Sequence, residues 1–189
     1  MNEDKQLPSN RNAAERRLLT TTNKLKGLNL LGQYSTIFLD WLKEGIIEEI
    51  GEDDKPNCFY LPHRAVIKPE SLTTPVRPVF DASAKVNRNP SLNESLYKGP
   101  NLLELIFNVL LKFREKRIGV ISDIRKAFQM IEVHEDDRDY LRFLWWDDSY
   151  KKYRIFRHRR VVFGVNCSPF LLAAVLEHHL DNVEPKDME

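Results

Sequence analysis

The clearest hydrophobic pattern in the chain is a short apolar run that carries an aspartate at its end. Residues 120–121 predict a buried strand, and Asp123 follows where the apolar pattern stops. Positions 131–133 then resume with the period of two that is typical of a strand. A carboxylate at the end of a buried strand is costly unless a positive group lies against it. Two explanations stay open: Asp123 pairs with a base such as Arg125 or caps the next turn, or it binds a metal ion.

Three further segments have the features of helices. Apolar residues from Tyr34 to Leu42 recur at i, i+3, i+4, i+7 and i+8, and Gly45 ends the pattern. Asn101 is suited to cap a second helix, and Ser168-Pro169 begins a third, with the serine as cap and the proline in the first turn. The buried stripe of the second helix is predicted to consist of Leu102, Leu105, Ile106, Val109, Leu110 and Phe113.

Strand patterns predict two antiparallel hairpins. The first joins residues 58–68, bent at Pro62, to a return strand over residues 76–81. Prolines at positions 75 and 78 confine that return strand to the edge of a sheet. The second hairpin joins residues 140–146 to residues 153–156. Helices and antiparallel strands together predict an α+β fold, an antiparallel sheet with packed helices.

The two ends of the chain carry little pattern. Residues 1–27 favour a polar lead-in that is either helical or disordered, and residues 181–189 form a polar tail. The domain proper is therefore expected over residues 28–180. With 189 residues, 42% of them hydrophobic, the chain is long enough for one domain or for a piece of a larger one.

Charge and cysteine content restrict the class of protein. A formal net charge of +1 excludes a polybasic nucleic-acid binder, so any attraction for phosphate must come from local clusters. Cys58 and Cys167 are far apart and predict free thiols in a reducing compartment. The longest apolar run, residues 170–176, is too short to span a bilayer. We expect a soluble intracellular protein, cytoplasmic or nuclear, with no membrane partner.

Four stretches in a fixed order resemble the reverse transcriptases of long-terminal-repeat retroelements, most closely those of the Pao (BEL) group of retrotransposons. They are Tyr60–Lys68 with Thr73-Thr74, Arg77–Ser83, Ser122–Ile131 and Phe163–Phe170. The resemblance implies the fingers and a truncated palm of a right-hand polymerase. It also implies an RNA-directed DNA polymerase that transfers nucleotides with two metal ions.

The resemblance implies a role for several residues of this sequence. Asp123 matches the first metal-bridging carboxylate, with the backbone carbonyl of Ile124 completing the shell of Mg²⁺. Phe128 matches the ring beneath the incoming sugar, where it rejects a 2′-hydroxyl; its alternative role is that of a core aromatic. Ala127 belongs to the same nucleotide-binding set.

The remaining nucleotide-binding residues come from other segments. Lys68 and Arg77 match the fingers positions that close on the triphosphate, the alternative being two exposed cations on an edge hairpin. Gly164 matches a position of close backbone approach to the nucleotide or template. Basic clusters within residues 112–117 and 151–160 either follow a nucleic-acid backbone or form solvated faces.

The chain departs from the family after Pro169. A polymerase palm needs a second strand-turn-strand with an aromatic-x-Asp-Asp signature there, and no such pair follows. Residues 145–148, Trp-Trp-Asp-Asp, imitate the signature but precede Gly164, so we expect them to form a surface turn. Phe163 stands where many relatives outside this group place a glutamine that contacts the nucleotide.

These observations predict a reverse transcriptase fragment that is inactive by itself. Its partners would be an RNA or DNA primer-template and a deoxynucleoside triphosphate, with thumb, RNase H and integrase domains supplied in an intact element. A non-catalytic nucleic-acid-binding or protein-interaction module is the alternative of a different class. A relic that folds poorly, with an apolar sheet edge uncovered, is the third.

Overall fold

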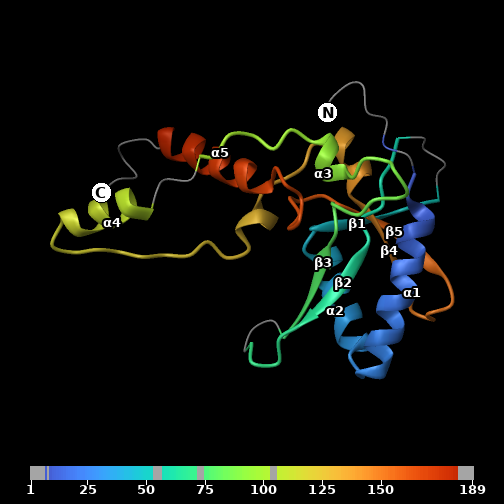
Figure 1. Ribbon diagram of the computed structural model, residues 1–189. Helices are drawn as coiled ribbons and strands as arrows, with labels where there is room; N and C mark the ends of the chain where they lie inside the picture. Colours follow the sequence, from blue (N-terminus) through green and yellow to red (C-terminus); the bar gives the residue numbers. More distant parts are fainter. Residues whose placement is uncertain (1–6, 8, 53–56, 72–74, 103–105, 183–189) are drawn as a thin grey trace.

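The computed structural model describes residues 7, 9–52, 57–71, 75–102 and 106–182, and it has an α+β fold with two antiparallel sheets (Figure 1). One sheet has the strand order β1-β5-β4 and the other pairs β2 with β3. The strands are β1 (Ile47–Ile50), β2 (His63–Ile67), β3 (Val76–Phe80), β4 (Arg142–Trp146) and β5 (Tyr153–His158). The helices are α1 (Arg11–Gly27), α2 (Leu31–Lys43), α3 (Leu92–Ser95), α4 (Ile106–Glu115) and α5 (Ser168–Asp181), with 3₁₀ turns η1 (Ala127–Met130) and η2 (Glu135–Leu141).

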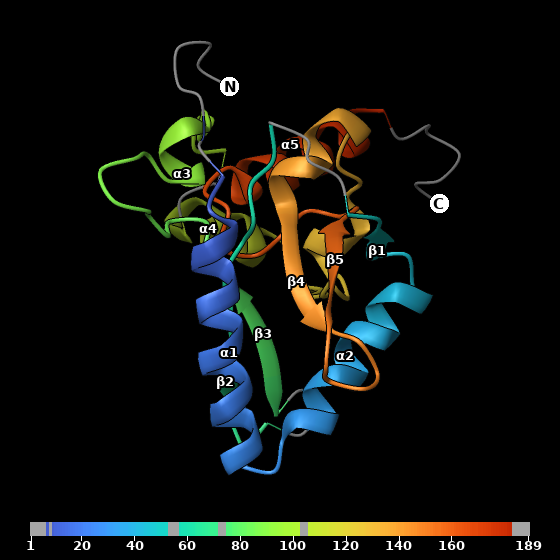
Figure 2. The same ribbon diagram turned by 90° about the vertical axis from the view of Figure 1, so that its right-hand side faces the viewer.

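Helix α1 covers the edge of the smaller sheet, which settles the open alternatives for residues 11–27 in favour of a helix. The Asn10 amide donates to the carbonyl of Tyr60 at 2.6 Å and accepts from its N–H at 2.8 Å. The Thr21 hydroxyl donates to the carbonyl of His63 in β2 at 3.0 Å. The His63 carbonyl lies on the side of β2 that does not pair with β3, and α1 runs along β2 (Figure 2). The helix therefore supplies hydrogen bonds that an unpaired strand edge would lack.

Helix α2 forms where the sequence predicts it, and Gly45 follows its end with a φ of +66°. Its buried face packs Tyr34 and Phe38 against β4, where the Phe38 ring lies 5.1 Å from both Phe143 and Trp145. Half-buried Trp41 lies at the margin of this aromatic core. The core thus lies between α2 and the two sheets, and the amphipathic pattern of residues 34–42 identified its helical side correctly.

Both predicted hairpins are confirmed. β2 pairs with β3 and β4 pairs with β5, each antiparallel. β3 has no partner on its second side, so the missing N–H of Pro78 costs no ladder hydrogen bond, as the prolines predicted. β1 adds to the free side of β5 and completes the larger sheet.

Ion pairs hold the larger sheet to η2. Arg142 is fully buried and donates to Asp139 at 2.9 Å, and Arg157 reaches the same carboxylate at 3.1 Å. Glu48 in β1 accepts from Arg157 at 2.6 Å. The arginines of the second basic cluster are largely engaged in such pairs: Arg154 with Glu49, Arg157 with Glu48 and Asp139, and Arg159 and Arg160 with Glu132. This part of the surface is therefore less available for phosphates than the sequence suggested.

The strand predicted at residues 120–121 is wrong for this structure. Residues 118–124 have no regular secondary structure, and Val120 and Ile121 are 83% and 85% exposed. The run keeps its strand-like composition, but none of the described strands pairs with it. A strand that is apolar on both faces is buried only when neighbours cover its faces and edges.

The buried stripe predicted for the second helix is wrong as well. Helix α4 extends away from the two sheets in Figure 1, and Val109, Leu110 and Phe113 are 41–48% exposed. Residues 103–105, which include Leu105, lie outside the described part of the chain. The amphipathic pattern is present, but the described residues offer it no apolar surface to pack against.

Two helix starts differ from the predictions. Helix α3 lies outside the three segments for which the sequence predicted a helix, and it forms because Ser91 and Glu94 build a reciprocal capping box. At α5 the cap position is Cys167, while the Ser168 hydroxyl donates to the carbonyl of Val162 at 2.7 Å. The serine therefore ties the helix start to the preceding segment and does not cap it.

Cys58 and Cys167 are not joined by a disulfide bond, as the sequence predicted. Within the described ranges, every helix is too short or too polar to cross a bilayer.

Candidate nucleotide pocket

A cavity of about 530 Å³ brings together Arg77 and Asp123, two residues that the sequence assigned to one site. Arg77 comes from β3 and Asp123 from the extended segment before η1, 46 positions later in the chain. Its other polar lining side chains are Lys126, Gln129 and His158, and its apolar wall consists of Ile37, Trp41, Ile46, Val76, Pro78, Phe80, Val161, Val162 and Phe163. Its volume lies within the range of about 300–1,000 Å³ that is usual for small-molecule sites.

Asp123 is exposed at this cavity, and none of the described residues forms an ion pair with its carboxylate. Pairing with Arg125, one of the two explanations left open by the sequence, is therefore not observed. Ile124 is 49% exposed and follows without regular secondary structure. The carboxylate is thus accessible, but no neighbouring strand holds it in place.

Lys68 and Arg77 project from one face of the β2–β3 hairpin. Arg77 is opposite Val66 in the strand register, and the Lys68 N–H bonds to the Pro75 carbonyl at 2.7 Å, which places the lysine diagonal to the arginine. Arg64 lies on the same face two residues before Val66, and all three basic residues are exposed. Of the three, Arg77 alone also lines the cavity.

Phe128 does not lie in an alternating strand. It belongs to η1 and is half-buried, and its ring meets the Phe163 ring edge-on with a centroid distance of 4.4 Å. Ala127, the first residue of η1, is also half-buried. Phe128 is therefore not a fully buried core aromatic. Its ring packs against the Phe163 ring, and Phe163 lines the cavity.

Gly164 permits a close backbone contact, although the contact is within the protein. Its φ is +99°, and a Cβ at this position would lie 2.5 Å from the carbonyl oxygen of Phe80 on the free edge of β3. Asn93 donates to the Gly164 carbonyl at 3.0 Å. The absent side chain thus allows the segment with Phe163 to lie against β3 and to close one wall of the cavity.

The residues at the cavity do not form a complete site for Mg²⁺. In the described part of the chain, no group of three or more His, Cys, Asp or Glu side chains converges, and Asp123 is the one carboxylate among the cavity's lining residues. Asp147 and Asp148 line a different cavity, beside Ser35 in α2. Asp147 accepts hydrogen bonds from Ser149 and from the Lys151 N–H, which also lower its pKa. As expected, this pair serves a surface turn.

No protein-family model and no curated protein sequence matches this chain. The chemistry of the cavity therefore depends on its own side chains. A guanidinium and a carboxylate face one space, with an amide and a wide apolar wall beside them. Such a set can hold an anionic group next to a flat apolar one.

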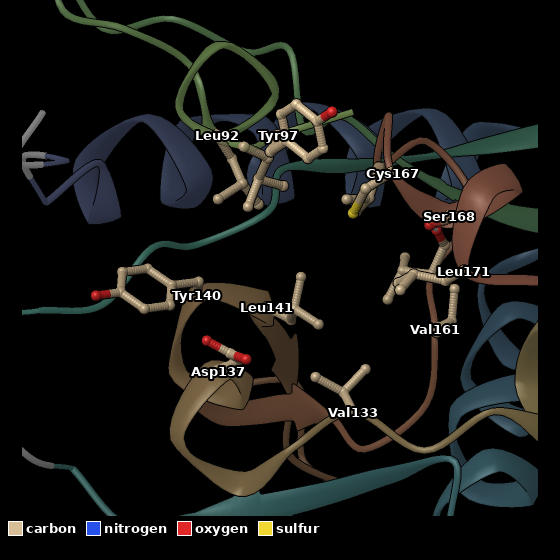
Figure 3. Close-up of a pocket in the computed structure, with 13 residues that line it drawn as sticks. Leu92, Tyr97, Val133, Asp137, Tyr140, Leu141, Val161, Cys167, Ser168 and Leu171 are labelled. Atoms are coloured by element: carbon tan, nitrogen blue, oxygen red, sulfur yellow. Dashed lines mark hydrogen bonds between the residues drawn. The ribbon is translucent and has the colours of Figure 1, made fainter. Parts of the chain in front are cut away.

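A second cavity, of about 260 Å³, lies between α3, η2 and the start of α5 (Figure 3). Aliphatic side chains such as Leu92, Leu141 and Leu171 surround it, and Asp137 is the one carboxylate among its described lining residues. Burial raises the pKa of the Cys167 thiol, so little thiolate is present at neutral pH. This cavity can accept an apolar group, but it lacks the convergent charges of the first.

The cavity also contains residues that the sequence analysis missed. Lys126 has a φ of +55° and forms an ion pair with Glu44 at the end of α2. Gln129 lines the cavity from η1, and His158 lines it from β5. Arg64 lies four positions before Lys68, so in a strand the two side chains share one face, and this spacing was a usable signal for a third cation on the hairpin. No local pattern indicated Gln129 or His158.

Proposed function

We propose that this chain is the fingers and incomplete palm of a Pao/BEL-type reverse transcriptase, and that its cavity at Arg77 and Asp123 takes a deoxynucleoside triphosphate. Four ordered sequence stretches support the family, and the cavity supports the site. The observation that carries the proposal is that Arg77 and Asp123, far apart in sequence, line one space of suitable size.

The charges are arranged for a phosphate chain. Guanidinium groups form strong, oriented hydrogen bonds with phosphate oxygens, and Arg77 presents one at the mouth formed by β3. Lys68 and Arg64 extend the positive charge along the outer face of the same hairpin. In the proposed function this face holds the triphosphate tail or the backbone of a template strand.

The apolar wall suits the rest of a nucleotide. Trp41, Val161 and Phe163 offer flat or aliphatic surfaces on which a base or sugar can pack. Phe128 packs edge-on against Phe163, so the Phe163 ring is held in place as part of this wall.

We propose further that these 189 residues cannot catalyse nucleotide transfer unaided. Asp123 is the one carboxylate among the described residues that line the cavity, and a single carboxylate with one backbone carbonyl does not fit a two-metal site. The remaining acidic ligands would have to come from another segment.

Nucleotide binding tests the site. We expect the chain to bind dGTP in calorimetric titration, and Arg77→Ala to weaken binding roughly 10- to 100-fold, the size of one lost charge-assisted hydrogen bond. Arg88→Ala is the matched control, because Arg88 is exposed outside the cavity. Equal affinities of the two variants, or no binding by the native chain, would refute the proposed site.

Primer extension tests the second part of the proposal. The purified chain should give no extension of a primer annealed to an RNA template in the presence of Mg²⁺ and all four deoxynucleotides. Magnesium-dependent DNA synthesis that Asp123→Asn abolishes would contradict the proposed inactivity.

A protein-interaction module is the second candidate function, and exposed apolar side chains favour it. Phe107 and Leu111 of α4 are 69% and 56% exposed, and Ile118 just beyond is 80% exposed. Apolar surface of this kind marks interaction sites on native proteins. Tight association with another protein without nucleotide binding would favour this candidate.

A further inference from the structure

We infer that Gln129 is a specificity-determining residue of the cavity, whose side-chain amide contacts the nucleoside part of the bound nucleotide. The inference rests on the proposed function, because it assigns a role within the same nucleotide site. It is carried by three features: the position of Gln129 at the cavity, the lack of a protein partner for its amide, and the chemistry of its neighbours.

The 3₁₀ turn η1 fixes the position of Gln129. The Gln129 N–H bonds to the Lys126 carbonyl at 2.7 Å, and the Ile131 N–H bonds to the Phe128 carbonyl at 3.2 Å. Phe128 packs against Phe163, and Lys126 is tied to Glu44. Both residues before Gln129 are thus anchored, and its side chain lines the cavity from a held backbone.

The side-chain amide of Gln129 is available to a ligand. It is half-buried, and none of the described residues forms a hydrogen bond with it. A half-buried amide has two donors and an acceptor that need partners. A ligand with polar edges can provide these partners in place of solvent.

The neighbours of Gln129 decide which part of a nucleotide it meets. Arg77 and Lys126 are cations suited to phosphates, while Asp123 repels them, so the phosphate tail belongs near Arg77. The Lys126 ammonium is paired with Glu44, whose negative charge offsets its attraction for a phosphate. Phe163 has no hydrogen-bonding side chain. The Nε2 of His158 is buried without a hydrogen-bond partner, inside the aromatic core.

Gln129 is therefore the accessible neutral side chain at the cavity that can both donate and accept. A sugar hydroxyl or a base edge needs such a partner, whereas a phosphate chain does not. The amide lies on the wall that also holds Phe163, where the sugar or base would pack. Gln129 thus distinguishes nucleosides by hydrogen bonding while Arg77 holds the phosphates.

The test compares two ligands that share their phosphates. Gln129→Met keeps the length of the side chain and removes its hydrogen bonds, and inorganic tripolyphosphate lacks the nucleoside. In calorimetric titration we expect Gln129→Met to weaken dGTP binding about tenfold and to leave tripolyphosphate binding unchanged. Arg77→Ala should weaken both ligands. Gln33→Met is the matched control, since Gln33 is an exposed residue of α2 outside the cavity.

Each outcome separates this inference from the proposed function. If Gln129→Met binds dGTP as the native chain does, or weakens both ligands by the same factor, the role of Gln129 is refuted and the site stands. If the native chain binds neither ligand, or if Arg77→Ala leaves both unchanged, the nucleotide site itself is refuted and the inference with it. Unchanged tripolyphosphate binding by Gln129→Met also shows that the variant is folded.

Discussion

The stability of this protein depends on single residues that have a few close contacts. Gly164 has a positive φ and faces a backbone oxygen, which cannot move aside as a flexible side chain can. His63 and His158 are buried among aromatic rings, where a neutral imidazole is tolerated and a charged one is not. Both features arise where β2, β3, β5 and the segment after β5 meet around Phe80.

Gly164→Ala should destabilise the fold by roughly 2–4 kcal/mol, since it adds a strained backbone conformation and a contact 2.5 Å from the Phe80 oxygen. Gly32→Ala is the control, because Gly32 lies in α2 with open space around it and should gain about 0.5–1 kcal/mol in helix propensity. Urea unfolding of both variants measures the difference. A Gly164→Ala protein as stable as the native chain would contradict the close packing against β3.

Stability should fall with acid between about pH 6.5 and pH 4. Burial lowers the pKa of His63 to about 4 and, with the nearby His63, that of His158 to about 3. Below the unfolded pKa near 6.5 the unfolded chain binds protons that the folded chain does not, so each histidine removes roughly 1.4 kcal/mol per pH unit. Above about pH 6.5 the two histidines cost nothing.

Urea unfolding at pH 7, 6 and 5 measures this dependence. His158→Phe should reduce the acid slope by about half without losing a hydrogen bond, because the His158 Nε2 has no hydrogen-bond partner in the described structure. His178→Gln, at an exposed position of α5, should keep the native slope. An identical slope for His158→Phe would argue against the neutral buried histidine.

Among the elements, α1 and the β2–β3 hairpin show how side chains replace missing strand partners. Asn10 bonds to both backbone groups of Tyr60, and Thr21 bonds to the carbonyl of His63, so the uncovered edge of β2 is satisfied by a helix. β3 has no strand partner on its other edge, where Pro78 has no N–H that needs an acceptor and Gly164 lies against the Phe80 carbonyl.

Asn10→Ala should therefore destabilise the protein by roughly 2–4 kcal/mol, because it leaves the N–H and the carbonyl of buried Tyr60 without partners. Thermal and urea unfolding measure the loss, and hydrogen exchange at the Tyr60 amide should speed up. Asn12→Ala, at an exposed position of α1, should change stability by less than about 0.5 kcal/mol. Similar effects of the two variants would show that α1 does not protect this edge.

The described part of the molecule divides into a packed body and a poorly covered central segment, residues 106–124. The body contains the aromatic core, both sheets and the ion-pair network. Beyond it, α4 and residues 118–124 expose large apolar side chains to solvent. Unpaired apolar strand segments readily pair with other chains.

We expect the chain to self-associate through residues 118–121. Replacing Val120 and Ile121 together by Lys should lower the association seen in sedimentation velocity and the fluorescence of bound ANS. Unfolding free energy should change by less than about 0.5 kcal/mol, because both side chains are already exposed. Ser122→Lys, which adds charge to the same segment without removing apolar surface, should retain more association than the double variant.

The sequence by itself determined those elements whose pattern is local. The 3.6-residue period of residues 34–42, the prolines of β3 and the hairpin of β4 and β5 each specified an element that the structure contains. The pattern of an amphipathic element depends only on which residues alternate along a few turns or positions. The apolar pattern also brought Asp123 forward as a candidate, whereas Arg77 became a candidate only through the resemblance of four sequence stretches to a known family.

Only the tertiary structure decided which patterned segments are buried and which side chains share a cavity. The strand pattern at residues 120–121 has no neighbouring strand among the described residues, so its apolar side chains remain in solvent. Gln129 and His158 line one cavity with Arg77 although they come from η1, β5 and β3, an arrangement of distant segments that has no local signal. Burial is a property of pairs of surfaces, and a single segment encodes only one of the two.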